Sequence, residues 1–149
     1  MIKLSIFAER LKELMLDDNQ ISTDELSSKV NVDSTAIREY LRGIRLPSMR
    51  VLINLADYFN CTTDFLLGLE AENYKTQFSK CPPFNERFAF LFKRKGKKKA
   101  QLKKKTNIPE SAIYNWLRGD FEPNVENLEK IAEFFECSID YLIGRVDYE

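Results

Sequence analysis

The sequence repeats itself at an offset of 76 residues, and this internal repeat limits the fold more than any other feature. Residues 26–70 and 102–146 are identical at many matching positions. The matches include Leu41-Arg42-Gly43 with Leu117-Arg118-Gly119, Pro47 with Pro123, Cys61 with Cys137, Asp64 with Asp140, and Gly68 with Gly144. The chain therefore consists of two related units of about 65 residues, a size that can fold alone.

The repeat also predicts where the units begin and end. With one residue deleted before position 98, the segment at 7–10 matches the segment at 84–87, so the repeat includes the start of each unit. The stretch between the repeats contains Pro82 and Pro83 and is typical of a linker. We therefore predict a first domain at 1–70, a linker at 71–83 and a second domain at 84–149.

The spacing of apolar residues is helical in both units. Apolar residues recur at i, i+4, i+7 and i+8, which is the period of one helix face. The residues are Phe7, Leu11, Leu14 and Met15 in the first unit, and Phe84, Phe88, Leu91 and Phe92 in the second. No stretch alternates with period two for long enough to indicate a strand. The fold class is therefore predicted to be all-α.

Capping signals divide each unit into five helices. Ser22 and Glu25 form a capping box at the start of a short second helix, whereas Lys98 in the second unit indicates that the box is lost there. Asp33 is expected to cap the third helix, and Pro109 to start its counterpart. Further N-caps are predicted at Ser48, Thr62, Asn124 and Ser138, and left-handed helix ends at Asn31 and Asn107.

Composition excludes several classes of site. The chain has no histidine, which removes histidine-based metal sites and histidine general bases. Its three cysteines, Cys61, Cys81 and Cys137, lie too far apart to indicate a zinc site or a disulfide framework. We therefore expect no enzymatic activity and no cofactor. No apolar run approaches the roughly 18–20 residues of a membrane span, and no signal-peptide core is present, so a cytoplasmic protein without membrane contact is predicted.

The positive charge is concentrated in one place, although the net charge is zero. Nine of the thirteen residues at 93–105 are lysine or arginine, and none is acidic. We call residues 93–105 the basic segment. Like charges this close together destabilise a helix, so the basic segment predicts an anionic partner that offsets the repulsion.

Both units resemble the helix-turn-helix domain of the Cro and phage-repressor family, also called xenobiotic-response-element-like regulators. The first unit carries the resemblance in DELSSKVNV at 24–32, IREYLRG at 37–43, LADYF at 55–59 and DFLLG at 64–68. The second carries it in AIYNWLRG at 112–119, Pro123, IAEFF at 131–135 and DYLIG at 140–144. The resemblance implies two tandem five-helix, lambda-repressor-like domains that bind double-stranded DNA. It also implies a transcriptional regulator, most simply a repressor from a bacterium, phage or mobile element.

The resemblance implies which side chains touch DNA, because the family inserts its third helix into the major groove. By position, the base-reading residues are Ser34, Thr35 and Arg38 in the first unit, and Glu110, Ser111, Tyr114 and Asn115 in the second. Arg38 would hold guanine and Asn115 would pair with adenine. Arg42 and Arg118 would contact phosphate or hold the following loop, and Arg45 would contact phosphate. A plain solvated surface is the alternative for the polar base-reading residues.

The start of the second helix departs from the family. The family usually has a glutamine at its second residue, where this chain has Thr23 and Lys99. Thr23 can still donate to a phosphate, and Lys99 can neutralise one. In this family the edge that the basic segment forms lies along a DNA strand, so Lys97, Lys98 and Lys99 are predicted to contact the backbone.

A second function class stays open. Carboxylates near the third helix of the first unit would repel phosphate; they are Asp17, Asp18, Asp24, Glu25, Asp33 and Glu39. They favour a protein-interaction module, such as an antirepressor or inhibitor, whose first domain binds protein rather than DNA. Two assemblies also stay open. We prefer a homodimer formed through the apolar edge of 139–143 with Val146 and Tyr148, over a monomer whose two units act as a pseudo-dimer.

Overall fold

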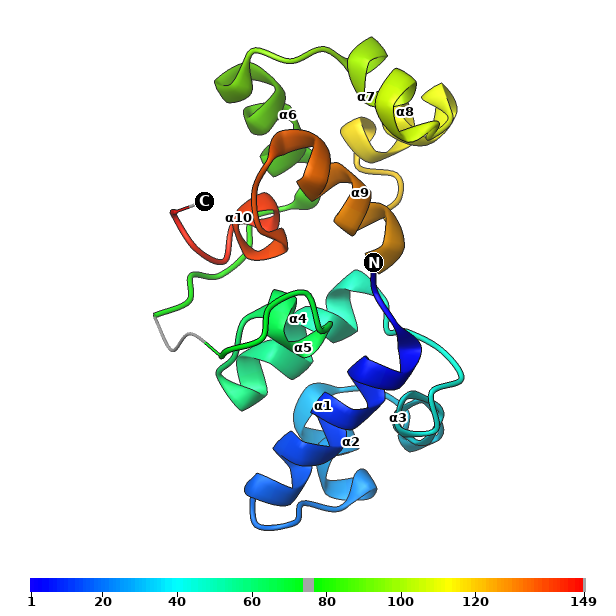
Figure 1. Cartoon of the computed structure of the whole chain (residues 1–149), viewed down its shortest axis with the longest axis vertical. Helices are drawn as coiled ribbons and strands as arrows, with labels where there is room; N and C mark the ends of the chain where they lie inside the picture. The colour runs from blue at the N-terminus through cyan, green and yellow to red at the C-terminus, as the bar shows by residue number, and fades with distance from the viewer. Residues whose placement is uncertain (74–76, 149) are drawn as a thin grey trace. The chain divides into compact units, whose positions relative to one another are not determined.

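The computed structural model describes residues 1–73 and 77–148, and the chain divides into two units, Met1–Thr76 and Gln77–Glu149 (Figure 1). Within the described residues each unit has five helices, and no strand is present. The predicted all-α fold with five helices in each unit is confirmed. The predicted linker positions 74–76 and the last residue, 149, lie outside the described residues. None of the described helices has both the length and the apolar character of a membrane span.

The first unit packs its helices around a small apolar core. Its helices are α1 Leu4–Asp17, α2 Thr23–Val30, α3 Ser34–Leu41, α4 Met49–Phe59 and α5 Thr63–Leu66. Phe7 and Leu11 of α1 are fully buried, as is Ile37 of α3. The rings of Phe7 and Tyr40 meet edge to face, with their centroids 5.8 Å apart. α3 is thereby held against α1, with its polar side outward.

The second unit repeats this order with a more aromatic core. Its helices are α6 Phe84–Lys95, α7 Lys99–Thr106, α8 Glu110–Arg118, α9 Val125–Phe135 and α10 Ile139–Ile143. Phe88 of α6 meets Trp116 of α8 edge to face at 6.2 Å. Phe92 packs in the same way on Phe135 of α9 at 5.2 Å. α8 therefore has the same place against α6 that α3 has against α1.

Most of the predicted helix boundaries are confirmed. Ser22 Oγ accepts a hydrogen bond from the N–H of Glu25 at 3.1 Å, as a cap of α2 should. Asn31 and Asn107 end α2 and α7 in the left-handed conformation, with φ of 54° and 62°. The other predicted N-caps also accept a backbone N–H: Ser48, Thr62, Asn124 and Ser138.

Three boundary predictions are wrong in detail. Asp33 is the N-cap residue of α3, but its side chain makes no cap hydrogen bond. Its ψ is 136°, whereas the side chains that do cap a helix sit on backbones with ψ from 150° to 168°. Pro109 precedes α8 as its N-cap residue rather than starting it. Half of the second capping box survives, because Gln101 Oε1 accepts from the N–H of Lys98 at 2.7 Å.

The apolar edge that we expected to join two chains is not exposed. Ile139, Leu142 and Ile143 are at most 1% exposed, and Val146 is 6% exposed. Only Tyr148 of the predicted edge is on the surface. The apolar residues of this segment are therefore core residues, and the sequence-based case for a homodimer through them was wrong.

A buried ion pair fixes the end of the second unit. Arg145 Nη1 lies 2.6 Å from Asp140 Oδ1, and both side chains are almost fully buried. The Arg145 guanidinium also lies 4.0 Å from the ring centroid of Phe78. The backbone carbonyl of Arg145 accepts a hydrogen bond from the N–H of Ser79 at 2.8 Å. Residues 78 and 79, which the sequence placed in a linker, thus contact the second unit. The first unit has Leu69 where the second has Arg145.

We expect Asp140→Ala to lower the free energy of unfolding of the second unit by about 3–5 kcal/mol, because it leaves a buried guanidinium without its carboxylate. The double variant Asp140→Leu, Arg145→Met should lose less, since no charge stays buried. Trp116 is the only tryptophan, so its fluorescence in a urea titration reports on the second unit. A double variant less stable than Asp140→Ala would contradict this account.

Candidate nucleic-acid interface

α8 presents a polar face because its apolar residues are held in the core. Ile113 is fully buried and Trp116 nearly so, which fixes how the helix is rotated. The predicted reading residues lie on the opposite side: Glu110, Ser111 and Tyr114 are exposed, and Asn115 is half-buried. Ala112 and Leu117, the other apolar residues of α8, are only half-buried.

Two cations around α3, Arg38 and Arg45, have carboxylate partners. The Arg38 guanidinium lies 3.5 Å from Asp24 Oδ1, and that of Arg45 lies 3.8 Å from Glu39 Oε1. Arg38 Nη1 also lies 3.5 Å from Ser34 Oγ. Two of the three arginines predicted to touch DNA in the first unit, Arg38 and Arg45, are thus near acidic side chains.

The other side chains of the first unit that were predicted to contact DNA lie at or near helix ends and are exposed or half-buried. Thr35 is exposed near the start of α3, and Arg42 is exposed directly after its end. Thr23 is the half-buried first residue of α2. Their positions follow the predicted pattern, while their contact with DNA remains a prediction.

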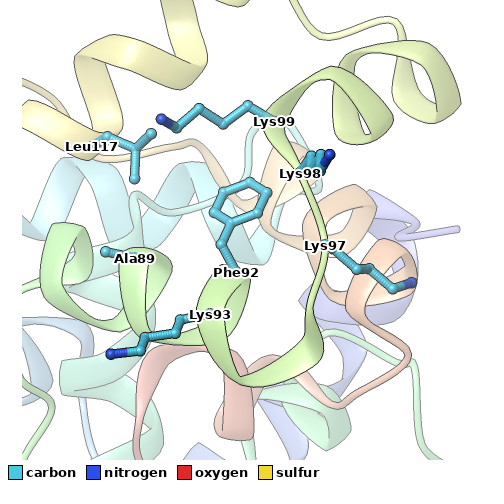
Figure 2. A pocket seen from close by; sticks show the side chains of 7 residues that line it. All are labelled: Ala89, Phe92, Lys93, Lys97, Lys98, Lys99 and Leu117. Carbon is cyan, nitrogen blue, oxygen red and sulfur yellow. The ribbon is translucent and has the colours of Figure 1, made fainter.

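Lysines of the basic segment point in different directions. Lys97 Nζ donates to the Phe134 carbonyl at 2.7 Å, and it lies 4.7 Å from the centroid of that ring. Lys99 Nζ instead lies 5.4 Å from the ring centroid of Tyr114 on α8. Figure 2 shows Lys99 extending toward Leu117 and Lys97 extending the opposite way. The structure therefore brings Lys99 to the predicted reading helix, whereas Lys97 caps the end of α9.

An open groove lies between α6 and α8, beside these lysines. Its volume is about 600 Å³ (Figure 2). The groove is lined by Ala89, Phe92, Lys93, Lys97, Lys98, Lys99 and Leu117. Its apolar residues come from α6 and α8, and Lys93 and Lys98 are exposed. The groove thus carries a positive edge next to the polar face of α8.

Two further ion pairs modify the electrostatics of α8. Lys103 Nζ lies 3.7 Å from Glu110 Oε2, so this lysine reduces the repulsion that Glu110 would exert on a phosphate. Arg118 Nε donates to Asp120 Oδ2 at 3.0 Å, and Arg118 Nη2 donates to Asn115 Oδ1. Arg118 thus donates hydrogen bonds to two side chains, whereas we had expected it to contact a phosphate or the carbonyls of the following loop. Sequence reasoning missed Asp120, although an acid two residues after an arginine was a usable signal.

Comparison with known proteins identifies the family. A helix-turn-helix family model of the Cro and C1 type matches residues 11–66 and 91–142, one match in each unit. The chain belongs to the helix-turn-helix family. No curated protein and no solved structure matched the chain. The two helix-turn-helix domains are those of a DNA-binding regulator, and α3 and α8 occupy the place of the recognition helix in this family.

We expect Lys98 and Lys99 to contribute to DNA affinity and Lys97 to contribute to stability. Lys98→Ala and Lys99→Ala should each reduce the slope of log affinity against log salt by roughly 0.9, because each removes one phosphate contact. Lys97→Met should leave that slope unchanged and lower the free energy of unfolding by about 1.5 kcal/mol, the low end for a charged hydrogen bond.

Anisotropy of a labelled random duplex over a salt series measures the slope, and urea denaturation measures stability. Lys130→Ala, at an exposed residue of α9 outside the basic segment, is the control. A slope that falls as far in Lys97→Met as in Lys99→Ala would refute this division of roles.

Proposed function

We propose that the chain is a sequence-specific transcriptional repressor, of bacterial, phage or mobile-element origin, that binds double-stranded DNA mainly through its second domain. The observation that carries this proposal is the position of the basic segment beside α8, with Lys99 against Tyr114 at 5.4 Å. A recognition helix with a positive edge can neutralise phosphates while its polar face reads bases.

The arrangement supports a division of labour within the second domain. Lys93, Lys98 and Lys99 would neutralise phosphates along the groove edge, and Ser111, Tyr114 and Asn115 would reach base edges in the major groove. Repression follows most simply, because a protein that occupies a promoter sequence blocks its use by polymerase. No catalytic step is needed for such a function.

A second function is favoured for the first domain. Arg38 and Arg45 have acidic partners at 3.5 and 3.8 Å, so this domain has less free positive charge for a phosphate backbone than the second has. Ile44, the residue before Arg45, is half exposed and apolar. A surface of paired charges around an apolar residue suits a protein partner, as in an antirepressor or inhibitor.

We expect Asn115→Ala to weaken binding to the preferred duplex by about 1–3 kcal/mol and binding to random DNA by little, because a base contact is lost. Arg38→Ala removes the predicted guanine contact of the first domain and should cost less, since Asp24 Oδ1 lies 3.5 Å from that guanidinium and competes with a base for it. Selection from a random duplex pool gives the preferred site, and anisotropy gives the affinities. Equal losses on both duplexes would reassign Asn115 to phosphate contact or folding.

We expect the chain to be a monomer, in which the second domain supplies most of the DNA affinity and the linked first domain can add a weaker contact. Helix-turn-helix proteins usually place two recognition helices about 34 Å apart on DNA, and covalent linkage raises the effective concentration of the second. Because the predicted dimer edge is buried, light scattering at micromolar concentration should give a mass near 17.5 kDa that does not change on dilution. A mass near twice that value would contradict the monomer and support a homodimer.

A further inference from the structure

Three side chains at the end of α8 form a chain of hydrogen bonds. Arg118 Nε donates to Asp120 Oδ2 at 3.0 Å, and Arg118 Nη2 donates to Asn115 Oδ1. The backbone turn after α8 brings them together. Gly119 has φ of 83°, and the N–H of Asp120 donates to the Asn115 carbonyl at 3.0 Å. Asp120 is thereby returned to the side of the helix that carries Asn115.

The first domain makes the same turn without this network. Gly43 has φ of 72°, and the N–H of Ile44 donates to the Glu39 carbonyl at 3.0 Å. Ile44 replaces Asp120 and offers no acceptor, while Glu39 replaces Asn115 and lies 3.8 Å from Arg45. The turn therefore does not require the network. The arginine is shared, as Arg42 and Arg118, whereas Asn115 and Asp120 occur only in the second domain.

The network acts on the orientation of the Asn115 amide, and base readout depends on that orientation. An asparagine amide has an acceptor oxygen and a donor nitrogen, and a half-turn about its last bond exchanges them. A guanidinium only donates, so Arg118 selects the orientation in which the oxygen faces it. The amide nitrogen then points away from Arg118, and the oxygen keeps a second lone pair for a base.

We propose that Arg118 and Asp120 are positioning residues that fix the amide of Asn115 in one orientation for base readout, a proposal that rests on the proposed DNA-binding function. Asp120 holds the guanidinium, and the guanidinium holds the amide oxygen. Less rotational freedom is then lost when the amide meets a base. Asp120 thus sets the preference at one base pair that it does not itself contact.

The test is selection from a random duplex pool by the full chain and its variants. Asn115→Ala should erase the preference at one base-pair position, and Asp120→Ala should reduce it at that same position by roughly three- to tenfold. The double variant should match Asn115→Ala alone, because Asp120 acts through Asn115. Affinity for random DNA should be equal or higher in Asp120→Ala, since an acidic side chain is removed.

Matched controls separate this role from a merely structural one. Ile44→Ala alters the same turn position in the first domain and should leave every preference unchanged. The unfolding midpoint of Asp120→Ala should also be unchanged, because an exposed ion pair contributes little to stability.

The outcomes distinguish the two proposals. If the parent chain enriches no sequence, the DNA-binding function itself fails. If the parent enriches a site and Asp120→Ala keeps all its preferences, the positioning role is wrong. It is also wrong if Asp120→Ala lowers preferences at all positions alike, or at a position that Asn115→Ala does not affect.

Discussion

One buried aromatic contact between the first and third helices of each unit determines which residues the recognition helix exposes. Tyr40 packs on Phe7 at 5.8 Å, and Trp116 packs on Phe88 at 6.2 Å. Tyr40 and Trp116 occupy matching repeat positions, but their partners come from different turns of the first helix. Because one face of a helix is fixed in the core, the other must face solvent. The rotation of α3 and α8, and hence the reading face, follows from this contact.

A second repeated contact closes each unit. Arg10 of α1 donates to the carbonyl of Phe65 and lies 4.1 Å from that ring centroid. Arg87 of α6 donates to the carbonyl of Tyr141 and lies 4.8 Å from its ring centroid. The first helix is thus tied to the end of the last helix in both units. The two units share these internal contacts, whereas their surface charges differ.

Local features could be predicted from the sequence, and features set by tertiary packing could not. The cap of Ser22 depends on a residue three positions away, so the sequence contains all the information needed. The burial of Ile139 and Leu142 was missed, because a short helix buried on all sides has no polar face to mark it. Lys97 was placed with its neighbours on the DNA edge, since a run of lysines gives no sign that the Phe134 carbonyl lies near one of them.

In the candidate site, too, the local feature could be predicted from the sequence and the feature set by tertiary contacts could not. The repeat predicted that Asn115 lies on the reading face, because position on a helix is set by spacing. It could not predict the orientation of the Asn115 amide, which depends on Arg118 and, beyond the helix end, on Asp120. Exposed contacts of this kind contribute little to stability, so they can change while the core stays the same. This is how one fold, repeated within one chain, can carry a surface of paired arginines in one domain and a lysine-edged surface in the other.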